Sequence, residues 1–516
     1  MEKLPIGIQD FGKLRERGFV YVDKTELIYQ LTQGGGYYFL SRPRRFGKSL
    51  LVSTLAELFR GHRTLFEGLW IHDRWDWSQT YAVLDFRFNN ASYKISGLEA
   101  FLKNELNYQA EAFQITLREA PYPNQFRELV TKLSQQHGRV VILIDEYDKP
   151  ILDYLDDIKQ AKANREVLKN FFSVLKSLDP HLRLVLLTGV SKFTGSPAGS
   201  VSIFSDLNNL KDLTLHWQYS ALLGYTQDEL EHYFADRIDQ FAPDFGGRAA
   251  LLAQIKQWYN GYTWDAKRYL YNPFSILSFF DQGRFQNFWF ETGTPMFLVK
   301  LLERERQYDL TEIRVDEAVF SSFELDHIDP NALLFQTGYI TIASADDKPI
   351  YTLSYPNREV RDSLLRYLLA EYTQSYASEV PVRAQQMKQA LEQEDLAGFV
   401  QALNSLFASI PYQIFIADRE AYCQSVTFLA LSLVGTFVQV EVSQAKGRPD
   451  AVVHTPDIIY VLEFKLDSSA QTALEQIKER GYAQPYVGGG KTVRAVGLNF
   501  NAQLKALDQW QQEAIQ

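Results

Sequence analysis

Residues 41–49 of this 516-residue chain read Ser41-Arg42-Pro43-Arg44-Arg45-Phe46-Gly47-Lys48-Ser49. The short apolar run 37–40 precedes them, and the apolar side chains of residues 49–59, which follow, have helical spacing. A strand, a loop that ends in Gly-Lys-Ser and a helix together form the arrangement that cradles phosphates. Further apolar runs at 82–86, 140–144 and 182–187, separated by helical stretches, predict a parallel sheet with flanking helices around this loop.

Each residue type in the loop has a chemical role to fill. Gly47 lets backbone N–H groups turn towards phosphate oxygens, and Lys48 reaches the β- and γ-phosphates. Ser49 offers its hydroxyl to Mg²⁺ at the start of the helix. For Arg44 and Arg45, stabilisation of transferred charge, contact with a partner and simple solvation all remain open. The candidate nucleotide-binding residues of the loop are Arg44, Arg45, Phe46, Gly47, Lys48 and Ser49.

The apolar run 140–144 ends in two acids, Asp145 and Glu146. We expect Asp145 to hold Mg²⁺ through its water shell and Glu146 to polarise the attacking water as a catalytic base. An acid pair after a strand can also be an ordinary helix cap, but Gly-Lys-Ser on the same chain favours the nucleotide site. The next apolar run leads to Thr188 and Ser191, either of which could sense the γ-phosphate or simply form a turn.

Composition limits the classes of protein that this chain can be. Its 53 Lys and Arg against 63 Asp and Glu give a net charge of −10, and 46% of its residues are hydrophobic. These values exclude a disordered chain and binding of nucleic acid through bulk positive charge. The single Cys423 excludes an internal disulfide framework and a cysteine-based metal site. The first residues do not read as a signal peptide, so we expect a cytoplasmic protein.

Residues 421–440 carry no charge and are numerous enough to cross a bilayer. Polar side chains interrupt this stretch and Gly435 divides it. We therefore expect a buried helix followed by a buried strand, and no membrane insertion.

Near the C-terminus, Asp450 opens a short apolar stretch that turns back into a second one ending in Glu463-Phe464-Lys465. Alternation around the turn predicts a β-hairpin in which Glu463 and Lys465 share a face and Asp450 lies beside Glu463. Two carboxylates on adjacent strands suit Mg²⁺ or Mn²⁺, and the carbonyl of Phe464 would be a further ligand. The neighbouring lysine can orient an attacking water and offset charge on phosphoryl oxygens. An exposed ion pair is the plain alternative.

Several stretches are similar to a known family. GFVYVDKTELI near residue 18, RPRRFGKS, LIDEYDKP and TGVSKF resemble bacterial and archaeal AAA-ATPase-like proteins that carry a C-terminal PD-(D/E)XK nuclease-type domain, and the resemblance covers nearly the whole chain. That family's own loop carries RPRRFGKS, so Arg42 departs only from the general P-loop rule, which has a glycine there. The resemblance implies an ATP-binding P-loop NTPase domain and a restriction-endonuclease-like α/β domain.

The same resemblance assigns residues around the hairpin. Glu420 lies on the preceding helix, where the superfamily often places an extra acid, and is a candidate metal ligand. Gln476 and Tyr482, on a helix after the hairpin, resemble the family's trailing motif. Gln476 would touch the scissile phosphate or only pack.

We expect three parts: a P-loop domain at 1–220, a helical lid with a winged-helix-like region at 221–375, and a nuclease-like domain with a helical spacer at 376–516. The winged-helix outline rests on a helix and hairpin at 331–356, which would contact DNA or pack as a lid. The leading hypothesis is an ATP-binding and ATP-hydrolysing protein coupled to a Mg²⁺- or Mn²⁺-dependent nuclease that cleaves nucleic acid, DNA before RNA.

The alternative is a nucleotide-dependent binding or signalling module whose nuclease-like domain is inactive. A metabolic P-loop kinase would leave the last hundred residues without a role. Whether the protein forms oligomers stays open.

Overall fold

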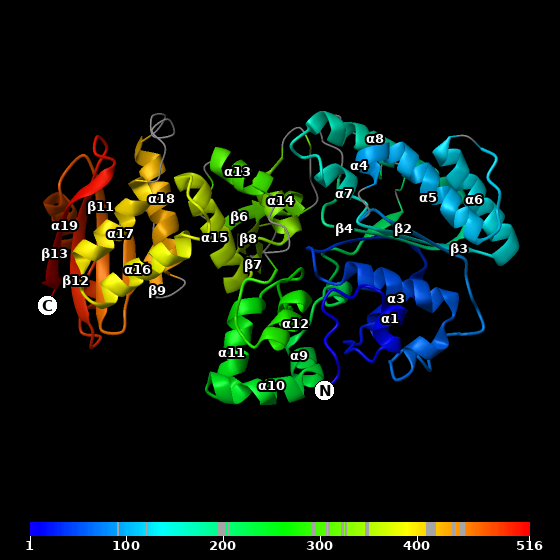
Figure 1. Ribbon diagram of the computed structural model, residues 1–516, viewed down its shortest axis with the longest axis horizontal. Helices are drawn as coiled ribbons and strands as arrows, with labels where there is room; N and C mark the ends of the chain where they lie inside the picture. The colour runs from blue at the N-terminus through cyan, green and yellow to red at the C-terminus, as the bar shows by residue number, and fades with distance from the viewer. Residues whose placement is uncertain are drawn as a thin grey trace. The chain divides into compact units, whose positions relative to one another are not determined.

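The computed structural model in Figure 1 divides into two compact units, Met1–Gly293 with Leu310–Val360 and Thr294–Asp309 with Arg361–Gln516. The residues described are 1–89, 92–119, 121–193, 202–204, 207, 209–289, 296–305, 307, 310–320, 325, 328–345, 350–408, 419–435, 439–442 and 449–515, without the side chains of 296, 419–424 and 439–442.

A parallel sheet organises the first unit, and its described strands have the order β2-β3-β4-β1-β5. β4 therefore lies between β1 and β3, and the segments that follow these three strands meet at the carboxyl edge of the sheet, where ligands of open α/β sheets bind. The strands are β1 (Gly36–Ser41), β2 (Val83–Arg87), β3 (Val140–Asp145), β4 (Leu182–Gly189) and β5 (Leu210–Asp212). The predicted parallel sheet is confirmed.

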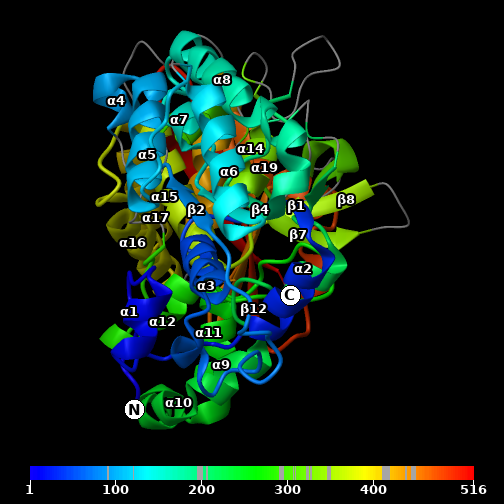
Figure 2. The same ribbon diagram turned by 90° about the vertical axis from the view of Figure 1, so that its right-hand side faces the viewer.

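Helices cover both faces of this sheet, as Figure 1 and Figure 2 show. α1 and α3 lie on one face, where Leu51, Leu55 and Phe59 of α3 join the buried core. α4 to α8 lie on the other. The helices are α1 (Phe11–Glu16), α2 (Thr25–Gly34), α3 (Lys48–Arg60), α4 (Tyr93–Ser96), α5 (Leu98–Ala112), α6 (Tyr122–His137), α7 (Lys149–Leu152) and α8 (Ile158–Ser173).

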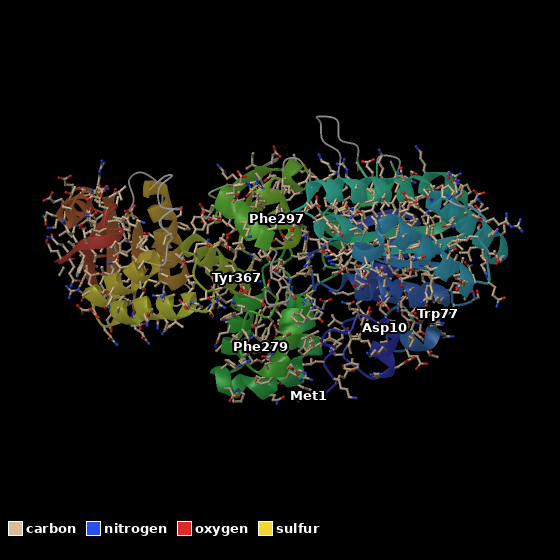
Figure 3. All side chains as sticks on the ribbon, turned by 45° about the horizontal axis from the view of Figure 1, so that its top comes forward. Met1, Asp10, Trp77, Phe279, Phe297 and Tyr367 are labelled. Carbon is tan, nitrogen blue, oxygen red and sulfur yellow. The ribbon has the colours of Figure 1, made fainter. Side chains whose placement is uncertain are left out.

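A helical region follows within the same unit and has its own aromatic core. Phe279, labelled in Figure 3, packs there against Tyr259 and Phe285. The side chain of Asn272 caps α12 and Pro273 occupies its first turn, which fixes where that helix begins. The helices are α9 (Gln227–Tyr233), α10 (Ala235–Phe241), α11 (Arg248–Tyr259) and α12 (Pro273–Gln282).

The helix and hairpin expected at 331–356 are present. α14 (Pro330–Thr337) precedes the antiparallel pair β7 (Thr341–Ala345) and β8 (Ile350–Ser354), and β6 (Ile313–Asp316) pairs with β8. Every residue from 332 to 336 in α14 is buried. Gly338, which ends the helix, lies so close to Pro43 that a Cβ there would be 2.6 Å from the proline ring. α14 is thus packed against the phosphate loop, as a lid would be.

The second unit holds a mixed sheet of order β13-β12-β11-β10-β9 in its described part. β11 and β12 are parallel and α19 connects them, whereas the other neighbours are antiparallel. The strands are β9 (Gln439–Val442), β10 (Ala451–His454), β11 (Ile458–Leu466), β12 (Thr492–Asn501) and β13 (Ala506–Ile515). The helices are α16 (Val380–Glu392), α17 (Leu396–Ala408), α18 (Arg419–Val434) and α19 (Ala470–Glu479).

Within the uncharged stretch 421–440, residues 421–434 belong to α18, as expected, and residues 439–440 open β9; whether that strand is buried lies outside the described side chains. Among the described residues, no helix is both long enough and apolar enough to cross a membrane. Two further helices are α13 (Met296–Arg304) and α15 (Arg358–Thr373); α15 begins in the first unit and continues into the second.

Candidate functional site

The phosphate loop connects β1 to α3, and its last residue is Gly47. Gly47 has φ +98°, a left-handed conformation that glycine adopts at little cost, and it stands at the N-cap of α3. No side chain caps this helix start. The first N–H groups of α3 are therefore available to an anion, and the helix dipole favours negative charge at the same place.

Lys48 is turned back onto the loop. Its Nζ donates to the carbonyl oxygens of Arg42 at 2.8 Å and Pro43 at 3.0 Å, and the residue is 5% exposed. Burial lowers the pKa of Lys48, although the nearby carboxylates of Glu146 and Asp145 oppose that shift. The sequence predicts that Lys48 reaches phosphates; in this conformation its ammonium would first have to leave the two carbonyls.

The loop residues before Gly47 are fixed by contacts with segments far along the chain. Arg42 is 1% exposed; its guanidinium donates to the carbonyls of Thr214 and Tyr219 and lies 4.0 Å from the centre of the Trp264 ring. Burial lowers the pKa of Arg42 to about 9. The Phe46 ring packs on Tyr262 and Trp264, so this side chain anchors the loop and only its backbone can face a ligand.

Arg44 and Arg45, which lie between Arg42 and Phe46, are exposed, but both make contacts with other segments. The carbonyl oxygen of Arg44 accepts a hydrogen bond of 2.9 Å from Nε1 of Trp289. Arg45 has φ +66°, and its guanidinium lies 5.0 Å from the centre of the Phe274 ring. Contacts with neighbouring segments thus fix the shape of this loop. In glycine-rich phosphate loops, tight turns alone fix that shape.

The acids after β3 face the same loop. Asp145 is 1% exposed; its Oδ1 accepts a 2.6 Å hydrogen bond from the Thr188 hydroxyl, while its Oδ2 has no partner among the described residues. A buried carboxylate oxygen without a donor is costly unless a cation or water meets it, so this residue suits a divalent cation. Glu146 has φ +55° and reaches the cavity beside the loop.

Asp148 belongs to the site, although the sequence analysis did not select it. Its Oδ2 accepts backbone N–H groups of Val190 at 2.7 Å and Ser191 at 2.6 Å, which ties the turn after β3 to the end of β4. Burial raises the pKa of Asp148 to about 6, against the lowering effect of these two hydrogen bonds. Ser191 is fully buried and its hydroxyl has no described partner. The sequence did contain a signal for this residue, because Asp148 is the third acid in LIDEYDKP, after the two that were selected.

A cavity of about 320 Å³ joins these groups, within the size range of small-molecule sites. Its lining includes the loop residues Gly47, Lys48 and Ser49 and the acids Glu146 and Asp148, but not Asp145. Apolar residues also line the cavity, and the sequence did not predict them. They include Pro5, Gly7, Ile8, Leu152, Tyr225, Pro273, Phe274 and Leu277.

The hairpin of the second unit brings two predicted acids together. Ala451 pairs with Leu462, so the next position in register sets Asp450 beside Glu463. Oδ2 of Asp450 accepts the Phe464 N–H at 2.7 Å, and Oε1 of Glu463 accepts Lys465 Nζ at 3.1 Å. Burial raises the pKa of both carboxyls, and the Asp450 charge raises that of Glu463 further. Glu463 is 3% exposed, and its Oε2 has no partner among the described residues.

α19 contributes a fourth side chain to this cluster. Gln476 Nε2 donates to Glu463 Oε1 at 2.5 Å. The helix lies directly on β12 at Gly497, where a Cβ would be 2.1 Å from the Ala470 carbonyl. Gln476 therefore orients the glutamate in this conformation.

Two further residues, Tyr482 and Glu420, were predicted for this site. Tyr482 was expected on the helix after the hairpin, but α19 ends at Glu479, and Tyr482 packs in the hydrophobic core of the sheet and α19. Glu420 lies in α18, but its side chain is outside the described residues. Among described residues, no group of three or more His, Cys, Asp or Glu side chains could hold a metal ion. Glu420, Asp450, Glu463 and the Phe464 carbonyl remain the predicted ligand set.

The fold and these sites define a P-loop NTPase-type domain joined to a nuclease-like α/β domain. The sequence model described as Predicted AAA-ATPase matches residues 5–197, and that of the PD-(D/E)XK nuclease superfamily matches residues 418–510. An uncharacterized protein in the vnfD 5' region of Azotobacter chroococcum mcd 1 is 40% identical over 514 residues, covering 97% of this chain and 96% of that protein. The chain belongs to this family of predicted AAA-ATPases with a C-terminal PD-(D/E)XK nuclease superfamily domain.

Among solved structures, the Orc1 protein of Aeropyrum pernix in complex with DNA aligns with 67% of this chain and 92% of that one, with 11% sequence identity and a TM-score of 0.26. At this TM-score the alignment adds nothing to the fold assignment.

Proposed function

We propose that this protein binds and hydrolyses ATP, and that its nucleotide state controls a Mg²⁺- or Mn²⁺-dependent nuclease in the second unit. The observation that supports this most directly is common to both sites. Each holds a buried carboxylate oxygen without a described partner, Asp145 Oδ2 in one and Glu463 Oε2 in the other. Each also holds a lysine near its acids: Lys465 bonds to Glu463, and Lys48 lies near Glu146 and Asp145 but must leave the Arg42 and Pro43 carbonyls to meet a phosphate. DNA rather than RNA as substrate, and a cytoplasmic location, belong to the same proposal.

In the first site, the N–H groups at the start of α3 and the ammonium of Lys48 bind the phosphates. Asp145 and Ser49 are the residues that would hold Mg²⁺, which supplies charge neutralisation when bound. Glu146 orients the attacking water and accepts its proton. The adenine ring packs on apolar residues of the cavity lining, such as Ile8 and Phe274.

In the second site, Asp450 and Glu463 would hold the divalent cation, whose charge offsets that of the phosphodiester when bound. Lys465 orients the attacking water and interacts with the phosphoryl oxygens. Its side chain is 25% exposed and bonds to Glu463 rather than extending into solvent, which favours the catalytic over the inactive version of this domain.

The nuclease half is tested with the full chain, Mn²⁺ or Mg²⁺, and single-stranded DNA, duplex DNA and RNA, each with and without ATP. Glu463→Gln should lower cleavage about 100-fold or more, because it removes a ligand charge. Glu475→Gln, an exposed acid on α19, is the matched control and should cleave like the wild type. Equal cleavage by wild type and Glu463→Gln, or none by either on any substrate, contradicts nuclease activity.

The ATPase half is tested by nucleotide binding and phosphate release. Lys48→Ala should weaken ATP binding, whereas Glu146→Gln should retain binding and lose turnover, because it removes only the base. Binding without turnover in the wild type would limit the first site to sensing ATP.

A second candidate function is a nucleotide-dependent binding or signalling module with an inactive nuclease-like domain. The net charge of −10 favours it, since nonspecific nucleases depend on positive surface to release counterions. ATP-dependent DNA binding without cleavage would identify this case.

A further inference from the structure

Trp289 fixes the orientation of a peptide in the phosphate loop. Its Nε1 donates to the carbonyl oxygen of Arg44 at 2.9 Å. The peptide bond is planar and trans, so the N–H of Arg45 points opposite to that carbonyl. Arg44 and Arg45 line the cavity, whereas Trp289 does not. The bond from Trp289 thus fixes the direction of the Arg45 N–H, which points away from the Arg44 carbonyl, in a loop that lines the cavity.

Trp289 is itself held by a buried carboxylate. Glu359 is fully buried; its Oε1 accepts the backbone N–H of Trp289 at 2.7 Å, and its Oε2 accepts the hydroxyl of Ser275 at 2.7 Å. The Trp289 ring packs on Tyr339 with centroids 5.3 Å apart. Hydrogen bonds to a charged group are stronger than neutral ones, and breaking them inside a protein leaves a costly unpaired group.

Glu359 therefore connects two parts of the nucleotide site to one helix. Ser275 lies on α12 next to Phe274, whose ring lines the cavity and lies under the Arg45 guanidinium. Glu359 itself is in the first turn of α15. α15 runs on from there, and after Val360 its residues belong to the second unit.

The phosphate loop has to change when a phosphate binds. Lys48 now bonds the carbonyls of Arg42 and Pro43, and it must release them to meet a phosphate. Arg44 is the next residue in the chain, so the loop backbone that accepts the bond from Trp289 adjoins the two carbonyls that Lys48 would release. A nucleotide that prefers one loop conformation must then also prefer one arrangement of the groups bonded to Glu359.

We propose that Trp289 and Glu359 are positioning residues that couple the phosphate loop to the start of α15. Nucleotide binding at the loop shifts the conformation or stability of this helix, and the coupling acts equally in both directions. The inference rests on the proposed function, because it requires that the cavity bind a nucleotide.

The test uses the full chain with a nonhydrolysable ATP analogue and Mg²⁺. Calorimetry gives the affinity, and hydrogen exchange of residues 358–373 with and without saturating nucleotide gives the response of α15. Trp289→Phe keeps an aromatic ring and removes the Nε1–H donor; it should weaken nucleotide binding about 10-fold, the equivalent of one lost hydrogen bond. Glu359→Gln keeps the shape of the side chain and should reduce the exchange response of α15.

The control is Trp217→Phe, at a tryptophan that is 67% exposed and does not line the cavity. It should match the wild type in affinity and in the exchange response. Thermal unfolding checks that each variant is folded, and if Trp289→Phe is not, Glu359→Gln alone carries the test.

Three results have distinct meanings. A wild-type chain that binds no nucleotide overturns the proposed function and the inference with it. A wild type that binds nucleotide without any change in exchange at 358–373 overturns the inference alone. Variants that retain wild-type affinity and the full α15 response overturn it as well.

Discussion

Asp148 is a buried acid that the protein keeps at a cost. It lies in a wall of the cavity, 1% exposed, with a pKa raised by burial to about 6 from an ordinary value of 3.8. The folded chain therefore binds this proton more tightly than the unfolded chain. The contribution of Asp148 to stability accordingly falls as the pH rises from about 4 to about 6 and is constant above that range.

Asp148→Asn should remove this dependence. The asparagine oxygen can still accept the N–H groups of Val190 and Ser191, but the side chain has no charge to bury. We expect the variant to gain on the order of 2 kcal/mol in free energy of unfolding over the wild type at pH 7.5, and less at pH 5. Chemical denaturation at the two pH values measures this difference. A difference that does not depend on pH would mean that Asp148 does not titrate in this range.

At the scale of residues, the sequence predicted groups that lie near one another in the chain or across one hairpin. Alternation along the hairpin was enough to bring together Asp450, Glu463 and Lys465. The same reasoning could not find Trp289, because its bond to Arg44 spans 245 positions. The sequence also could not show that Tyr482 packs in a core, because a tyrosine at that position suits a core as well as a catalytic site.

The contact between α14 and the phosphate loop belongs to the scale of elements. Gly338 ends α14 with φ +90°, and a Cβ there would lie 2.6 Å from the ring of Pro43. Gly246 is a close match in backbone, with φ +81° at the end of a short 3₁₀ helix, but a Cβ there would make only an ordinary contact of 3.7 Å with Ala250.

Comparing Gly338→Ala with Gly246→Ala separates backbone strain from the loop contact. Gly246→Ala should cost about 1 kcal/mol, the price of a left-handed alanine. Gly338→Ala should cost more and should also weaken nucleotide binding, because Pro43 must move. The free energy of unfolding and the affinity for an ATP analogue check this expectation, and equal effects of the two substitutions would show that α14 does not control the loop.

Secondary structure was largely predictable because buried parallel strands are continuous apolar runs. The runs 82–86, 140–144 and 182–187 each correspond to a strand. The ends of each run differ from the ends of its strand by at most two residues. What α14 packs against was not predictable, since an apolar helix before a hairpin suits a DNA-reading module and a lid equally well. Only tertiary contacts distinguish these two uses.

At the scale of the whole molecule, the two units have separate hydrophobic cores and separate candidate ligands. We expect two unfolding transitions in calorimetry. MgATP should raise the free energy of unfolding of the first unit, and Mn²⁺ that of the second unit. The increase should be about 2.7 kcal/mol when the ligand is in hundredfold excess over its dissociation constant. Chelation should reverse the effect of Mn²⁺.

Two variants show which unit gives rise to each unfolding transition. Lys48→Ala should abolish the shift caused by nucleotide, and Glu463→Gln the shift caused by Mn²⁺. One transition that responds to both ligands alike would show that the two units unfold together.

The contacts that hold the phosphate loop also govern how this protein can be divided. Trp264, Phe274, Trp289 and Gly338 all lie beyond residue 220, outside the stretch that matches the ATPase family. A truncated chain ending there would expose Phe46 and strip Arg42 of its aromatic cover. If the first site binds a triphosphate as proposed, we expect the smallest fragment that does so to extend to about residue 360, because a shorter one would lack these contacts to the loop.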